Sequence, residues 1–85
     1  MKTFTYTIKD AVGIHARPAG LLVKLVKSLD STVTITKGDK SVNASQLMKL
    51  MGMGIKCGDT VNFTIEGGNE DASAKAVEDF MNENL

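Results

Sequence analysis

Three residues near the start of the chain, His15, Arg17 and Pro18, have the types and the spacing that could do chemistry. His15 is the only histidine and Pro18 the only proline of the sequence. An imidazole can act as a nucleophile or a general base near neutral pH, and the planar guanidinium of an arginine can bind a phosphate group with two hydrogen bonds. The pattern is therefore compatible with phosphate chemistry at His15. The simpler interpretation is that His15 is a turn residue and that Pro18 only starts a helix, since short motifs match by chance.

The elements on either side of His15 favour a phosphate site. Residues 3–8 alternate between threonine and apolar side chains as a strand does, and after Pro18 the apolar residues follow helical spacing. The start of a helix leaves about four N–H groups without partners and carries roughly half a positive charge, so it binds anions. We expect Ala16, Arg17 and Pro18 to form this helix start. Because the residue before a proline avoids the helical region, Arg17 is expected just outside the helix proper.

The rest of the chain predicts an α+β fold. Strands are expected at residues 32–36, 41–43 and 60–65, with a hairpin turn at 37–40. A short helix is expected after Ser45 and a last helix after Asn69, and both residues suit the cap position. The order is β-α-β-β-α-β-α. We predict an open-faced β-sandwich, in which a four-stranded antiparallel sheet carries three helices on one face.

Composition narrows the classes of protein. Eighty-five residues with 42% hydrophobic content form one domain, residues 1–85, and a net charge of zero argues against a nucleic-acid binder. Residues 57–85 hold seven of the ten acidic residues, whereas residues 1–56 hold nine of the ten basic ones, so one end could meet acidic partners. Cys57 is alone, which excludes an internal disulfide, and no metal site or cofactor site is evident. Without a signal peptide or membrane-spanning run, a cytoplasmic location is expected.

The segment GIHARPAG at residues 13–20 resembles the active-site segment of HPr, the histidine-containing phosphocarrier of the bacterial phosphoenolpyruvate-dependent sugar phosphotransferase system. Lys24, Lys27 and the framework of residues 42–55 extend the likeness along the chain. The resemblance implies that His15 accepts a phosphoryl group from enzyme I through Nδ1 and passes it to IIA domains of sugar permeases. It implies a carrier rather than a turnover enzyme. We expect a monomer, although the sequence does not show whether a dimer forms. No carboxylate lies within three residues of His15, which fits a carrier whose partners complete each active site.

The resemblance also implies a surface for docking partners beside His15. The residues at the corresponding positions are Gly20, Lys24, Lys27, Leu47, Met48, Lys49, Met51, Gly52 and Met53. Methionines are adaptable at interfaces, although those of a short helix are as often part of the core. A lone lysine is often merely solvated, so the lysine assignments depend on the resemblance.

Regulation is where the chain departs from the family. Many HPr proteins carry a serine at the start of the second helix, where a dedicated kinase phosphorylates it and thereby recruits a transcriptional repressor. In this chain Gln46 stands at that position, and Ser45 precedes it. One helical step turns a side chain by about 100°, so Ser45 would be presented differently. We expect the serine switch to be absent or weakened. A pure interaction module is the alternative to a carrier, but the regulatory relatives of that kind typically lack the histidine.

Overall fold

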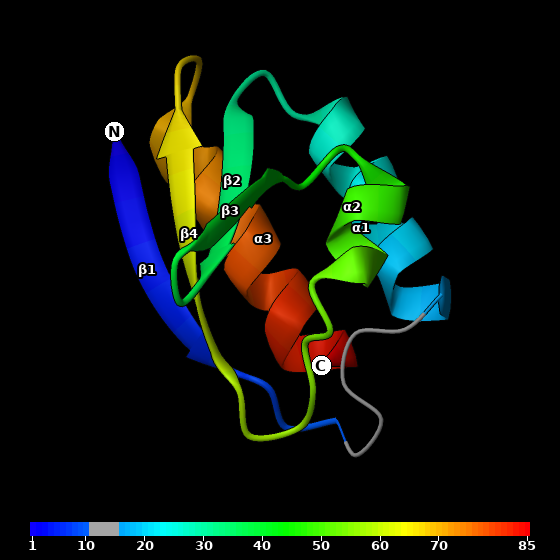
Figure 1. Ribbon diagram of the computed structural model, residues 1–85. Helices are drawn as coiled ribbons and strands as arrows, with labels where there is room; N and C mark the ends of the chain where they lie inside the picture. The colour runs from blue at the N-terminus through cyan, green and yellow to red at the C-terminus, as the bar shows by residue number, and fades with distance from the viewer. Residues whose placement is uncertain (11–15) are drawn as a thin grey trace.

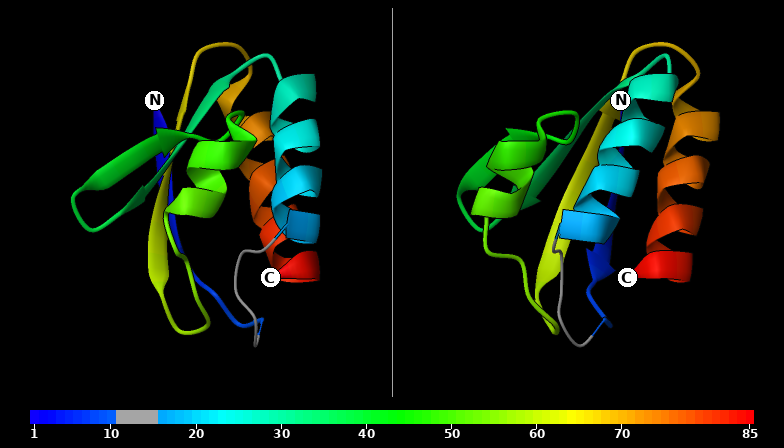
Figure 2. Two further views of the ribbon diagram at one scale, coloured as in Figure 1. Left: turned by 45° about the vertical axis from the view of Figure 1, so that its right-hand side comes forward. Right: turned by 90° about the vertical axis from the view of Figure 1, so that its right-hand side faces the viewer.

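The computed structural model describes residues 1–10 and 16–85, which form four strands and three helices (Figure 1). The strands are β1 (Lys2–Thr7), β2 (Thr32–Lys37), β3 (Lys40–Asn43) and β4 (Thr60–Glu66); the helices are α1 (Ala16–Ser28), α2 (Leu47–Gly52) and α3 (Glu70–Asn84). The sheet order is β1-β4-β2-β3, and every pair is antiparallel. Figure 2 shows the helices on one face of this sheet. The predicted open-faced sandwich is confirmed.

Strand alternation separates the core from the open face of the sheet. Val33, Ile35, Val61, Phe63 and Ile65 point toward the helices and are buried, whereas the polar residues between them (Thr34, Asn62 and Thr64) lie on the other face. β-branched and aromatic side chains suit a pleated surface that is covered on one side. The helices therefore cover the sheet with their apolar stripes.

Helix α1 buries Ala19, Leu22, Val23 and Val26, as its spacing predicts. The prediction that Arg17 lies outside the helix is wrong, because α1 begins at Ala16. Pro18 is the third residue of the helix, within the first turn. There a missing N–H leaves no intrahelical bond unmade, and the restriction on the preceding residue is a preference that the surrounding fold can overcome.

The start of α2 also differs from the prediction. The helix begins at Leu47 with Gln46 in the cap position, and Gln46 makes no side-chain cap hydrogen bond. The hydroxyl of Ser45 instead donates to Asn43 Oδ1 over 2.7 Å, and the Ser45 N–H donates to the same oxygen over 2.9 Å. Asparagine side chains commonly stabilise such turns. Ser45 is therefore a turn residue, not the cap. The other predicted cap is confirmed, since Asn69 Oδ1 accepts from the Ala72 N–H.

Candidate functional site

The first turn of α1 forms the described part of the predicted phosphate site. His15, together with Gly13 and Ile14 of the same motif, lies outside the described residues. Ala16 and Arg17 are exposed, whereas Pro18 and Ala19 are buried against the core. This arrangement fixes the helix start while leaving its polar end open to solvent. An anion held there would meet the positive end of the helix dipole and a guanidinium that can bind it with two hydrogen bonds.

A pocket of about 300 Å³ lies at this end of the helix layer. It is lined by Asp10, Arg17, Pro18, Leu21, Glu83 and Asn84, so it brings together the segment after β1, the start of α1 and the end of α3. Figure 2 shows the ends of α1 and α3 close together. Carboxylates, a guanidinium and an amide share the pocket, which makes Arg17 part of a concave polar surface rather than an isolated charge.

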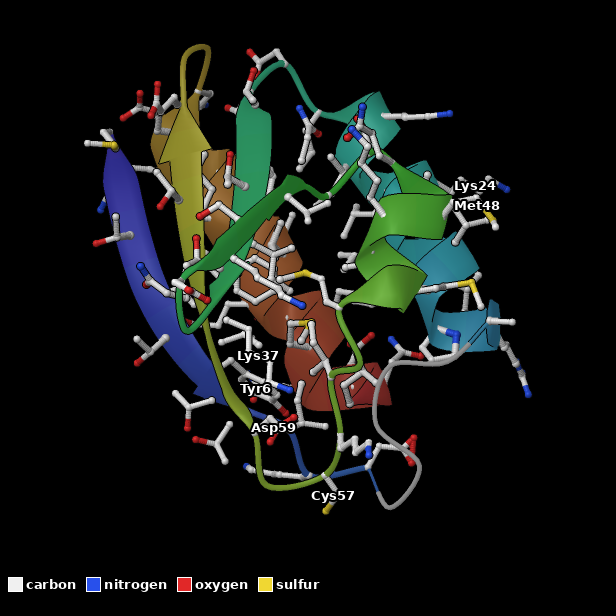
Figure 3. All side chains as sticks on the ribbon, viewed as in Figure 1. Tyr6, Lys24, Lys37, Met48, Cys57 and Asp59 are labelled. Atoms are coloured by element: carbon white, nitrogen blue, oxygen red, sulfur yellow. The ribbon has the colours of Figure 1, made fainter. Side chains whose placement is uncertain are left out.

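An exposed apolar face lies next to this site. We define the docking face as Leu21 and Lys24 of α1 together with Leu47, Met48 and Met51 of α2. The two helices contact one another, and Figure 3 shows Lys24 and Met48 at the edge where they meet. Met48 is 80% exposed. Large apolar side chains that gather on a surface mark sites of protein interaction.

The structure places the other predicted docking residues as follows. Lys27, Lys49 and Gly52 are exposed, and Gly20 is partly buried. An added Cβ at Gly20 would meet no described atom within 4 Å, so close packing does not require the glycine. Met53 was predicted to contact docking partners, but its side chain is only 7% exposed and belongs to the core with Leu50. It follows the last residue of α2, where the chain turns inward.

Leu21 was missed by the sequence analysis although it is 44% exposed and lines the pocket. It lies four residues after Arg17 and three before Lys24, and residues at these spacings are neighbours on a helix surface. The helical spacing that identified the buried stripe could therefore have shown Leu21 between the two basic side chains.

Two further properties concern cofactors and membranes. Over residues 1–10 and 16–85, no group of three or more histidine, cysteine, aspartate or glutamate side chains could hold a metal ion. None of the helices in these ranges is long and apolar enough to span a bilayer.

Known proteins match this chain over nearly its whole length. A family model described as PTS HPr component phosphorylation site matches residues 2–83. The phosphocarrier protein HPr of Mycoplasma capricolum subsp. capricolum is 35% identical over 81 residues, which cover 95% of this chain and 91% of that protein. The multiphosphoryl transfer protein of Escherichia coli O157:H7 is 34% identical over 77 residues; the match covers 87% of this chain but only 20% of that longer protein.

A solved structure shows the same fold. The crystal structure of HPr-C-His from Thermoanaerobacter tengcongensis superposes with a TM-score of 0.92 at 36% identity, covering 98% of this chain and 93% of that one. The sheet order and the placement of the helices are therefore those of a known phosphocarrier structure.

Proposed function

The chain belongs to the HPr family of the phosphotransferase system, and we propose that it accepts a phosphoryl group on His15 from enzyme I and passes it to IIA domains of sugar permeases. The observation that carries the proposal is that His15 directly precedes the first residue of α1, with Arg17 exposed in the first turn. We further propose that the chain works as a monomer in the cytoplasm, without a cofactor, and is a carrier rather than a turnover enzyme.

The helix start suits a carrier because it stabilises phosphate only modestly. A charge at an exposed helix terminus gains about 0.3–1 kcal/mol, and up to about 2 kcal/mol in partly buried geometry. This is enough to position a phosphoryl group and too little to trap it. A phosphorylated imidazole whose ring is protonated leaves as a neutral group, so the next acceptor can displace it. Arg17 would then stabilise the charge of the phosphoryl group during transfer.

Partners would dock over the first turn of α1 and the docking face. Met48 supplies a flexible apolar contact, and the exposed Lys24, Lys27 and Lys49 add positive charge around it. Exposed charges at the rim of an interface act mainly on the rate of encounter. We therefore expect the lysines to steer acidic partner surfaces toward His15.

Regulation through a serine is absent or weakened in this proposal. Gln46 occupies the cap position of α2, is exposed and has no hydroxyl. The hydroxyl of Ser45 is engaged with Asn43 and is partly buried. Phosphorylation of Ser45 would have to break that hydrogen bond, and the side chain would still lie one helical step from the usual position.

The proposal is tested with phosphoenolpyruvate and purified enzyme I. The wild-type chain should gain the mass of one phosphoryl group, and His15→Ala should gain none. The core cluster of the described residues is formed by other side chains, so the variant should melt like the wild type by circular dichroism. A folded His15→Ala variant that is still phosphorylated would overturn the proposal.

A further inference from the structure

The chain that leads into residues 11–15 is held at the end of β1 by two separate groups of hydrogen bonds. On one side, Ile8 and the turn at residues 56–59 exchange two backbone bonds: the Ile8 N–H donates to the Asp59 carbonyl over 2.9 Å, and the Gly58 N–H donates to the Ile8 carbonyl over 2.8 Å. On the other side, the N–H groups of Lys9 and Asp10 donate to the backbone oxygen of Leu85 over 2.6 and 2.8 Å. Residues 8–10 are thus tied to two distant parts of the sequence.

The turn at residues 56–59 closes with a backbone bond from the Asp59 N–H to the Lys56 carbonyl over 3.0 Å, and one ion pair ties it to β2. Lys37 Nζ lies 2.8 Å from Asp59 Oδ2, and the same carboxylate oxygen accepts from the Lys56 N–H over 2.8 Å. Lys37 also donates to the Gly54 carbonyl over 3.2 Å. The two side chains of the pair are 34% and 30% exposed, in contrast to the Lys75–Asp79 pair of α3, which is 3.7 Å long and far more exposed. Lys37 therefore joins the end of β2 to the segment between α2 and β4.

We propose that Lys37 and Asp59 are positioning residues, which fix the turn at residues 56–59 and through it the exit of β1 toward His15. The inference rests on the proposed function, because it concerns the placement of the phosphoryl acceptor. Lys37 and Asp59 lie on a different part of the molecule from Lys24 and Met48 (Figure 3), so they are not placed to contact a partner bound at the docking face.

The pair acts on geometry rather than on phosphate. Five residues separate Asp10 from Ala16, the first residue of α1, and α1 is anchored by buried Pro18 and Ala19. Of the two ends of the segment at residues 11–15, the Lys37–Asp59 pair can therefore shift only the end that follows β1. Group transfer is sensitive to such shifts, since a displacement of about 1 Å can slow a reaction about a hundredfold. Loss of the pair should lower the rate of transfer within the complex and leave the affinity for the partner unchanged.

The experiment compares Lys37→Met with Lys75→Met, which removes the lysine of the exposed pair on α3. Phosphoryl transfer from phosphorylated enzyme I is followed by rapid quench, with rates normalised to the folded fraction from circular dichroism. Lys37→Met should lower kcat by about tenfold or more with KM unchanged, whereas Lys75→Met should match the wild type. Lys37→Arg, which can still pair with Asp59, should retain most of the rate. Because the two side chains act as a unit, Lys37→Met with Asp59→Asn should be no slower than the slower single variant.

Two readouts that do not depend on transfer complete the test. Hydrogen exchange at the Ile8 N–H should become faster in Lys37→Met and stay unchanged in Lys75→Met. The ring proton resonances of His15, the sole histidine, should shift in Lys37→Met only. A normalised kcat within twofold of the wild type would overturn the inference, as would a change in KM alone or equal losses in both lysine variants. If the wild-type chain accepts no phosphate, the proposed function itself fails. If the wild-type chain accepts phosphate and Lys37→Met transfers it equally fast, only the inference about Lys37 and Asp59 fails.

Discussion

Alanine substitutions at Met48 and Met53 separate the docking face from the core in one experiment. Met53 is buried, and truncating a buried methionine to alanine costs about 2–5 kcal/mol of unfolding free energy through lost burial and the cavity left behind. Met48 is almost fully exposed and packs little in the free protein, so its truncation should change stability by less than about 0.5 kcal/mol. Denaturant melts measure both values.

For the affinity to enzyme I, Met48→Ala should have the larger effect and Met53→Ala the smaller. Full burial of a methionine side chain contributes about 1.5–3 kcal/mol, and alanine retains only part of that apolar surface. Met48→Ala should therefore lose about 1–2 kcal/mol of binding free energy, which is about 5–30-fold in Kd by titration calorimetry. Met53→Ala should bind within about twofold of the wild type at a temperature where it is folded. A Met48→Ala variant with unchanged affinity, or a Met53→Ala variant that loses less than about 1 kcal/mol of stability, would refute the assignment.

Three further predictions concern phosphate, regulation and pH. Arg17→Lys keeps the charge but loses the planar two-pronged contact, so quenched-flow transfer from enzyme I should slow about tenfold or more while Kd changes little; equal losses would make Arg17 a docking residue. Incubation with the HPr serine kinase and ATP, followed by peptide mapping, should yield no stoichiometric phosphoserine at Ser45, and finding it would contradict the proposed loss of that switch. The α-amino group of Met1 and the Gly67 N–H hold the pKa of Glu70 below its ordinary value of 4.5, so ionised Glu70 stabilises the fold above that pH and this contribution is lost as the pH falls through the lowered pKa. Glu70→Gln should remove that part of the acid dependence in denaturant melts, and an unchanged profile would count against the ion pair.

Local patterns were sufficient to predict the framework of the fold. The alternation around Phe63 and the stripe containing Leu22 each repeat over several residues, so the buried face could be identified without knowledge of the neighbours. Asn69 was predicted as a cap because asparagine favours that position, and its side chain does accept a hydrogen bond from the Ala72 N–H within its own turn. The element order then limited the sheet to an antiparallel arrangement.

The predictions that failed depended on contacts outside the local pattern. Ser45 is a residue type that commonly caps helices, but its hydroxyl donates to the side chain of Asn43 instead. Met53 belongs to the same methionine-rich run as Met48, and only the turn after α2 sends it into the core. The pair of Lys37 with Asp59 joins residues from separate elements, which no periodicity can reveal.

The central claim is that His15 carries a phosphoryl group from one partner to the next. The direct measurement uses phosphoenolpyruvate labelled with radioactive phosphorus, enzyme I, this chain and a IIA domain, sampled by rapid quench and peptide mapping. The account predicts that label appears first on the peptide containing His15 and then declines as label rises on the IIA domain. It also predicts that both signals vanish with His15→Ala. Label on another residue of the chain, or label that reaches the IIA domain equally well with His15→Ala, would contradict it.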